Sequence, residues 1–321
     1  MKIIFFGSDD FADAHFERLL DEGYQIVACV TQPDKPKDRG MKITMSPIKA
    51  RALMHNIPVL QPETLKSNSI VEDLRVFNAD VFVVIAYGRF LTPEILALPK
   101  IGSLNVHGSL LPKYRGAAPI NWAILNGEIE TGITIIRLNA QMDAGDIISQ
   151  VKLLISEDET SVELRQGMIA AGCELLSYTL KNFNADTKGV PQDDKNISFA
   201  PKLTKQLGLI DWNRPAKNIH DQIRGLQPWP LAHTFIKNKQ LSIFSSSIVD
   251  VRFGDVLPGV VVQINNEGAV IATGDGTLLI REVQPAGSRR MDMSAFVRGA
   301  RLVVGDRFVD MEDDKTNILK I

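Results

Sequence analysis

Asn105 and His107 lie two residues apart at the end of a short apolar run, and Gly108 and Pro112 follow them closely. On a β-strand, residues spaced by two point to the same face, and the glycine and the proline predict that the strand ends there in a turn. Open α/β sheets bind ligands at the carboxyl ends of their strands. The pair therefore predicts an active site at the end of a strand.

The chemistry that suits this pair is a reaction in which negative charge builds on a carbonyl oxygen, because an amide and an imidazole can both donate hydrogen bonds to that oxygen. No cysteine, serine elbow or lysine stands beside His107 as an attacking group. Direct transfer between two bound substrates is therefore favoured over a covalent intermediate. The alternative interpretation is that Asn105 and His107 only end a strand and satisfy the backbone of a turn.

The residues around Asn105 and His107 favour the active-site interpretation over a simple strand end. The run from Asn105 to Ile120, NVHGSLLPKYRGAAPI, is followed by MDAGD at residues 142–146. Together they resemble the signature of the methionyl-tRNA formyltransferase family, which is a folate-dependent formyl-transfer family. The similarity extends from Ile3 to about Phe308 and includes TQPD at 31–34, VIAYG at 84–88, QPWP at 227–230 and ATGDG at 272–276. Short motifs are shared with relatives that act on other amines, but the run from Ser109 to Pro119 is more specific to this family.

The resemblance implies an enzyme that moves the formyl group of 10-formyltetrahydrofolate to the α-amino group of initiator methionyl-tRNA, for translation initiation. It implies that Asn105, His107 and Asp143 are catalytic. It also implies that folate is bound largely through backbone groups, by Tyr87, Gly88, Arg89, Phe90, Leu91, Ser109, Leu110, Leu111, Pro112 and Leu138. For Tyr87 the alternative is an aromatic residue at a strand end that packs on its neighbours.

Two acidic residues of one loop are candidates for the carboxylate that lies beside His107. A nearby carboxylate can orient an imidazole and favour its charged form. Asp143 has the spacing from Asn105 that the resemblance requires, whereas Asp146 follows Gly145, where an acid commonly caps a turn. We expect Asp143 to be the partner of His107.

The composition indicates a cytoplasmic protein with two domains. The chain has 321 residues, of which 45% are hydrophobic, and this length is enough for two cores of ordinary size. The formal net charge is −2, so an RNA partner would have to meet local basic patches. Cys29 and Cys173 have no disulfide or zinc spacing, and no apolar stretch is long enough for a signal peptide or a membrane span. We expect a monomer without a metal.

The first part of the chain alternates strand and helix patterns, which predicts a Rossmann-like, doubly wound, mostly parallel sheet over residues 1–185. Expected strands are Ile3–Phe6, Gln25–Thr31, Val59–Leu60, Val81–Ala86 and Gly132–Leu138, and expected helices are Phe11–Leu20, Pro47–His55, Asn68–Phe77, Ala117–Leu125 and Thr160–Phe183. The turn after Phe6 lacks the second and third glycines of a dinucleotide loop and carries Asp9 and Asp10. These features argue against NAD as a cofactor and against membership of the glycinamide ribonucleotide formyltransferases, because both ligands carry phosphate that needs a Gly-rich anion site at this turn.

The second part of the chain has a different character. Residues 186–207 are polar and predict a linker. Residues 208–310 contain short apolar runs with turn signals, which predict a small β-barrel. The resemblance implies that this barrel is OB-like and binds tRNA, and we expect 311–321 to be a tail. The predicted tRNA contacts are Lys35, Lys37, Arg39, Lys42, Arg289, Arg290, Arg298 and Arg301. The first four rest on the resemblance, and ordinary surface charge explains the other four about as well as phosphate binding does.

Two other functions stay open at this point. A relative with the same first domain could formylate an amino sugar nucleotide, or the chain could be a noncatalytic folate- or RNA-binding module. The presence of Asn105, His107 and Asp143 together argues against the module.

Overall fold

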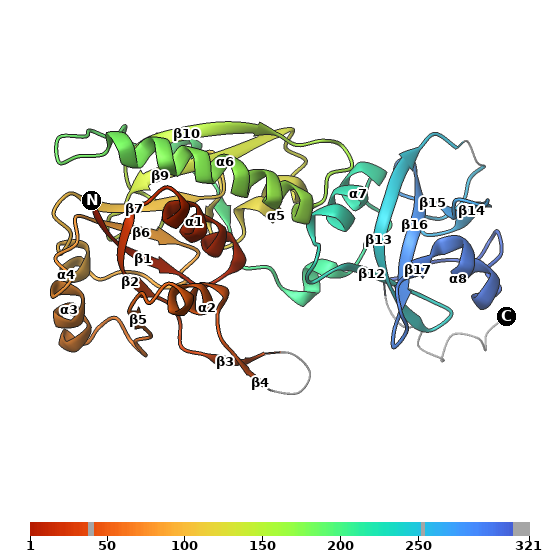
Figure 1. Cartoon of the computed structure of the whole chain (residues 1–321). Coiled ribbons are helices and arrows are strands. Elements are labelled where there is room, and N and C mark those ends of the chain that lie inside the picture. The colour runs from red at the N-terminus through yellow and green to blue at the C-terminus, as the bar shows by residue number, and fades with distance from the viewer. Residues whose placement is uncertain (38–41, 252–253, 311–321) are drawn as a thin grey trace. The chain divides into compact units, whose positions relative to one another are not determined.

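The computed structural model describes residues 1–37, 42–251 and 254–310, and the chain divides into two compact units (Figure 1). Unit 1 comprises Met1–Pro119, Glu130–Leu154 and Arg165–Pro201, and unit 2 comprises Ile120–Ile129, Ile155–Leu164 and the chain from Lys202. The segment 186–207, which the sequence predicts as a linker, is therefore divided between the units. Its part up to Pro201 has a structural role in unit 1.

A seven-stranded sheet forms the centre of unit 1, in the order β10-β9-β7-β6-β1-β2-β5. The strands are β1 (Lys2–Gly7), β2 (Gln25–Val30), β5 (Val59–Leu60), β6 (Val81–Ile85), β7 (Gly102–His107), β9 (Glu130–Arg137) and β10 (Ile147–Leu154). Strands β5, β2, β1, β6 and β7 are parallel, and β9 runs antiparallel to β7 and β10. The mostly parallel sheet predicted from the sequence is confirmed.

Helices cover both faces of this sheet (Figure 1). One face carries α1 (Asp10–Asp21), α2 (Pro47–Met54) and α6 (Ser161–Asn182), and the other carries α3 (Asn68–Arg75) and α4 (Pro93–Leu96). Alternate residues of β1 explain this division: Phe5 meets Phe16 of α1 with ring centroids 5.1 Å apart, whereas Phe6 packs in the cluster that contains Ile70 and Ile95. The sheet is thus doubly wound, because each face buries one set of side chains.

Local signals set the ends of two helices. Ser46 accepts a hydrogen bond from the Lys49 backbone at the start of α2, where Pro47 follows. Before α6, the Thr160 backbone N–H donates to Glu163 Oε2 at 2.9 Å and the Glu163 N–H donates to Thr160 Oγ1 at 3.3 Å. These two reciprocal bonds form a capping box.

The polar stretch between Thr31 and Ser46 contains secondary structure that its composition does not indicate. Strands β3 (Lys35–Lys37) and β4 (Lys42–Thr44) pair antiparallel with each other. Arg39, a predicted tRNA contact, lies outside the described residues.

Unit 2 is built on an antiparallel sheet, which confirms the β-rich character predicted for this part of the chain. Its strands follow the order β12-β13-β16-β15-β14. They are β12 (Ala232–Ile236), β13 (Lys239–Val249), β14 (Val261–Ile264), β15 (Ala269–Ala272), β16 (Thr277–Pro285) and the short β17 (Met291–Asp292), and the accompanying helices are α5 (Pro119–Leu125), α7 (Ala216–Gly225) and α8 (Met293–Ala300).

One segment near residue 308 joins both edges of this sheet. Phe235 in β12 forms a bridge with Val309, and Val260, next to β14, forms a bridge with Arg307. The sheet therefore closes on itself, which leaves fewer unpaired edge groups. Its interior is filled by an apolar cluster that includes Trp212, Ile243 and Phe308.

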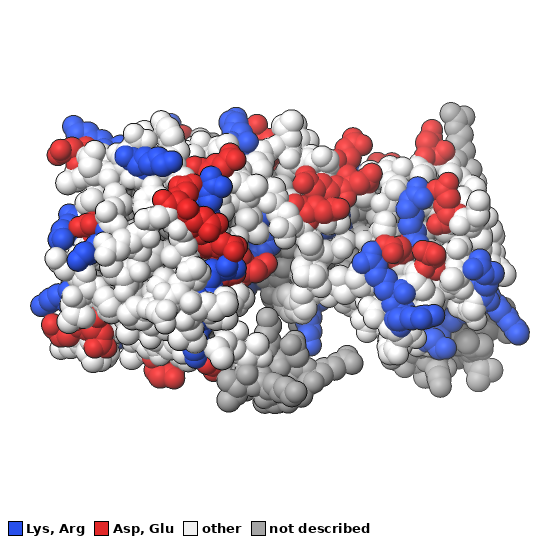
Figure 2. Space-filling view, in the orientation of Figure 1, with Lys and Arg blue, Asp and Glu red and all other residues white. Residues whose placement is uncertain are grey.

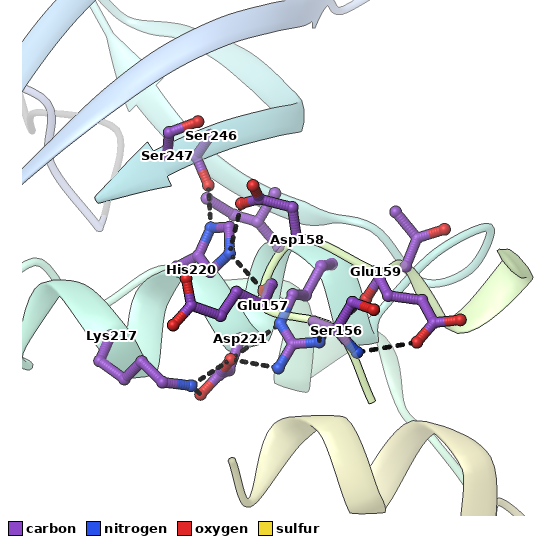
Figure 3. Close-up of polar contacts among 12 residues, drawn as sticks. Ser156, Glu157, Asp158, Glu159, Lys217, His220, Asp221, Ser246 and Ser247 are labelled. Atoms are coloured by element: carbon purple, nitrogen blue, oxygen red, sulfur yellow. Dashed lines mark hydrogen bonds and ion pairs between the residues drawn. The ribbon is translucent and has the colours of Figure 1, made fainter. Parts of the chain in front are cut away.

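A polar cluster ties residues 155–160 to α7 within unit 2 (Figure 3). His220 lies with Nδ1 3.0 Å from Ser246 Oγ and Nε2 3.1 Å from the Glu157 carbonyl. Arg224 forms an ion pair with Asp221 at 2.8 Å, and both side chains are buried. A buried charge needs such a partner, so this cluster has a structural role.

No helix in the described part of the chain has the length and apolar character needed to cross a membrane. Among the same residues, no group of three or more His, Cys, Asp or Glu side chains is placed to hold a metal ion.

Candidate active site

Strand β7 places Asn105 and His107 inside the sheet. Asn105 lies between Val84 of β6 and Ile136 of β9. His107 is the last residue of β7, lies opposite Thr134 of β9, and is 5% exposed. Both side chains approach the same carboxylate, so the spacing of two residues brings them to one face.

That carboxylate belongs to Asp143, in the loop between β9 and β10. Its Oδ1 lies 3.5 Å from Asn105 Nδ2, and its Oδ2 lies 3.7 Å from His107 Nδ1. The Gly116 backbone N–H donates to Oδ2 at 2.9 Å. Asp146, the competing acid, has an exposed side chain. The structure therefore brings together Asn105, His107 and Asp143.

The second ring nitrogen of His107 contacts the backbone. Nε2 lies 2.9 Å from the Tyr114 carbonyl, and a carbonyl only accepts, so Nε2 carries a hydrogen. In the neutral ring the lone pair is then on Nδ1, the nitrogen that faces Asp143. Nδ1 can donate to an oxyanion only in the charged ring. The expectation that His107 donates to the oxyanion therefore applies only to its protonated form, whereas Asn105 Nδ2 is a donor at every pH.

The turn after β7 is held by a network around Thr134. Thr134 Oγ1 donates to the Ser109 carbonyl at 2.6 Å and accepts from the Leu111 N–H at 3.0 Å. Gln150 on β10 donates to the Leu111 carbonyl at 2.9 Å. These bonds anchor the turn to the two strands beside the site.

The ten residues predicted to bind folate differ in exposure. Gly88 and Phe90 are exposed, Arg89, Leu110, Pro112 and Leu138 are half-buried, and Tyr87, Leu91, Ser109 and Leu111 are buried. Tyr87 packs edge-on against Phe6, with ring centroids 5.5 Å apart, as in the alternative interpretation. Burial raises the pKa of its hydroxyl. Arg89 donates to the Pro62 carbonyl at 2.7 Å. If residues 87–91 contact folate, the contacts would come mainly from their backbone groups and from the exposed side chain of Phe90.

Neither cysteine is suited to act as a nucleophile. Burial raises the pKa of the Cys29 thiol to about 12 and that of Cys173 to about 11. The reactive species of a cysteine is the thiolate, so both side chains stay protonated and inert near neutral pH.

The predicted tRNA contacts of unit 2 are not equivalent. Arg289, Arg298 and Arg301 are exposed. Arg290 is exposed as well, but it forms an ion pair with Glu282, and its guanidinium lies 4.5 Å from the centre of the Phe244 ring. Figure 2 shows basic side chains gathered on the displayed face of this unit, with acidic ones among them. The side chains of Lys35, Lys37 and Lys42 are outside the described set.

Sequence reasoning missed Gln192. This residue lies in the segment predicted as a linker, and its amide donates to the Asp143 carbonyl at 2.7 Å and to the Gly145 carbonyl at 2.8 Å. Nothing in the polar run from Gln192 to Asn196 marks it out, because its partners are far away in the sequence.

A doubly wound sheet with an amide, an imidazole and a carboxylate at one strand end is suited to a group-transfer enzyme that stabilises charge on a carbonyl oxygen. Residues 1–180 match the family described as Formyl transferase, and residues 202–301 match Formyl transferase, C-terminal domain. The chain belongs to the formyl transferase family.

Relatives are similar over nearly the whole chain. A methionyl-tRNA formyltransferase from Acetivibrio thermocellus is 42% identical over 307 residues, which is 95% of this chain and 99% of the relative. One from Caldanaerobacter subterraneus subsp. tengcongensis is 44% identical over 308 residues, again 95% and 99%.

Solved structures share the fold. The sugar 3N-formyl transferase WlaRD, crystallised with dTDP and 5-N-formyl-THF, is 22% identical with a TM-score of 0.66, over 90% of this chain and 99% of WlaRD. HypX from Aquifex aeolicus, in complex with tetrahydrofolic acid, is 18% identical with a TM-score of 0.64, over 92% of this chain and 47% of HypX.

Proposed function

We propose that this chain transfers the formyl group of 10-formyltetrahydrofolate to the α-amino group of initiator methionyl-tRNA. The observation that carries the proposal is the Asp143 carboxylate, which lies within 3.7 Å of both Asn105 and His107. Support for the acceptor comes from relatives named methionyl-tRNA formyltransferase, which align with 95% of the chain. Both WlaRD and HypX were crystallised with folates, which supports a folate as the formyl donor.

The geometry assigns a role to each of the three side chains. The amine nitrogen attacks the formyl carbon, and the Asn105 amide donates to the oxyanion that forms. His107 accepts the proton of the amine at Nδ1, because Nε2–H is already bonded to Tyr114. The Asp143 carboxylate stabilises the resulting imidazolium. When the carbon–nitrogen bond to the folate breaks, His107 returns the proton to the departing nitrogen.

We assign folate binding to the segments around Gly88 and Leu138, and tRNA binding to two other regions. Phe90 is 68% exposed, and an exposed aromatic ring can stack on a flat heterocycle. The stretch from Lys35 to Lys42 and the arginines of 208–310 would contact the tRNA, while 1–185 would carry the catalysis. We further propose a cytoplasmic monomer, whose mass can be measured by light scattering.

The test of this function is a transfer assay. Methionyl-tRNA and an amino sugar nucleotide are each incubated with the protein and a labelled formyl donor. Label on the tRNA alone is the expected result. Label on the sugar would favour the alternative enzyme, and donor binding without transfer to any amine would indicate a noncatalytic module.

A further inference from the structure

Gln192 contacts two parts of the site at once. Its side-chain amide nitrogen donates to the carbonyls of Asp143 and Gly145, at 2.7 and 2.8 Å. Its oxygen accepts from Nε and Nη2 of Arg115, at 3.0 and 2.7 Å. Gln192 therefore joins the loop of the catalytic carboxylate to the strand β8 (Arg115–Gly116).

The loop that it holds has an unusual backbone. Asp143 has φ +49°, a left-handed conformation that is unfavourable for a non-glycine residue. A Cβ on Gly145 would lie 1.8 Å from the Arg137 carbonyl oxygen, so the chain doubles back tightly here. Two hydrogen bonds from one amide can offset the cost of this conformation.

The chain after Gln192 makes further contacts near the site. Ser198 accepts from the Tyr114 N–H at 2.9 Å, and Tyr114 provides the carbonyl that bonds to His107. Strand β11 (Phe199–Ala200) pairs with β8, which contains Gly116, the donor to Asp143. Residues 192–200 thus contact both the loop of Asp143 and the segment 114–116.

We propose that Gln192 is a positioning residue for formyl transfer, which holds Asp143 in the conformation that directs its carboxylate at Asn105 and His107. This inference rests on the proposed function for its kinetic test. Its geometric test does not require any substrate.

The kinetic test uses Gln192→Glu, which keeps the oxygen that faces Arg115 but removes both amide donors. We expect kcat for methionyl-tRNA to fall roughly tenfold to a hundredfold, because a small displacement of a catalytic group has that effect. The KM values should stay within about twofold. Gln192→Leu is the second variant, and Gln166→Glu, at an exposed position on α6, is the matched control. A kcat unchanged in both Gln192 variants overturns the inference.

A double-mutant cycle shows whether Gln192 acts through Asp143. In an Asp143→Asn background, Gln192→Glu should have little further effect on kcat, because residues that act as a unit are not additive. An equal loss in both backgrounds would place the effect elsewhere and overturn the inference.

The geometric test measures hydrogen exchange of the Gly116 amide, which donates to Asp143 Oδ2. We expect exchange to accelerate at least about tenfold in both folded Gln192 variants and to stay unchanged in Gln166→Glu. Unchanged exchange in the Gln192 variants would overturn the inference even if the wild-type protein formylated no tRNA. A wild-type protein that is inactive on methionyl-tRNA would refute only the proposed function.

Discussion

Asn105 can donate a hydrogen bond to the oxyanion in every protonation state of the site, whereas His107 can do so only when its ring is charged. Its amide lies in mid-sheet between β6 and β9, so the backbone fixes where it points. His107 changes its role with charge, because only its Nδ1 faces the site. A permanent donor beside a ring that can take up a proton suits a reaction in which charge appears on an oxygen and a proton moves.

Asn105→Ala should lower kcat by roughly two to three powers of ten, the usual effect of deleting an oxyanion donor. Affinity for the formyl donor should change little, since the lost bond forms only in the transition state. Single-turnover kinetics with methionyl-tRNA measure the first quantity and equilibrium titration the second. Near-normal turnover would remove Asn105 from the chemistry.

Asp143→Asn should cause a similar loss and should alter the pH profile of kcat, because the variant keeps the size of the side chain but lacks the charge beside His107. Asp146→Asn is the matched control, because it makes the same change at an exposed side chain in the same loop. We expect it to retain activity within about twofold. If the two phenotypes were exchanged, the assignment of Asp143 would be wrong.

At the scale of elements, α1 and α6 pack so closely that they bury a histidine completely. His15 is fully buried, and its Nδ1 lies 2.8 Å from the Phe11 carbonyl. Its Nε2 has no hydrogen-bond partner among the described residues, and a Cβ on Gly172 of α6 would lie 2.6 Å from it. Burial, with a smaller contribution from the charge of Arg165, lowers the pKa of His15 to about 4.

The resulting prediction concerns stability in acid. The unfolded chain binds a proton at His15 near pH 6.5, and the folded chain does so only near pH 4, so the free energy of unfolding falls as the pH drops through this window. The loss from this residue is on the order of 3 kcal/mol. Urea unfolding of wild type and His15→Gln at several pH values measures the difference in slope.

The difference between the two proteins in how the free energy of unfolding depends on pH reports on His15 alone. Burial lowers the pKa of His220 as well, but that contribution is present in both proteins and cancels. We expect a shallower dependence in His15→Gln between pH 4 and 6.5. Parallel curves would show that His15 does not titrate on unfolding in this range.

At the scale of the whole molecule, the residues of the candidate site and the predicted tRNA contacts of unit 2 differ in exposure. The proposed catalytic side chains are buried or half-buried within unit 1, whereas Arg289, Arg298 and Arg301 are exposed in unit 2. With a net charge of −2, long-range attraction to a polyanion is weak. Affinity for tRNA would therefore depend on local contacts with phosphates.

Arg298→Ala should weaken tRNA binding and reduce the slope of log affinity against log salt by about one unit, if its guanidinium neutralises one phosphate. Arg290→Ala is the comparison, because Arg290 is already paired with Glu282 and should change the slope less. Filter binding over a range of salt concentrations measures both. Equal slopes for wild type and Arg298→Ala would exclude that contact.

Much of the fold was readable from local patterns. The expected strands and helices of unit 1 depend on residues a few positions apart, and their geometry is set by backbone periodicity. The same is true of Asn105 and His107, whose spacing on a strand places them on one face. Sequence alone therefore determined most of the strands, the longer helices and the location of the pair, whereas the order of the strands in the sheet was set by their tertiary pairing.

Tertiary structure decided the rest of the site. Asp143 reaches Asn105 across 38 positions, and Gln192 reaches Asp143 across 49 and Arg115 across 77. The Tyr114 carbonyl, placed by a turn and a distant serine, decides which nitrogen of His107 faces the carboxylate. No local pattern carries this information, because these hydrogen bonds form only after the sheet has brought β7, the 138–146 loop and the 192–200 segment together.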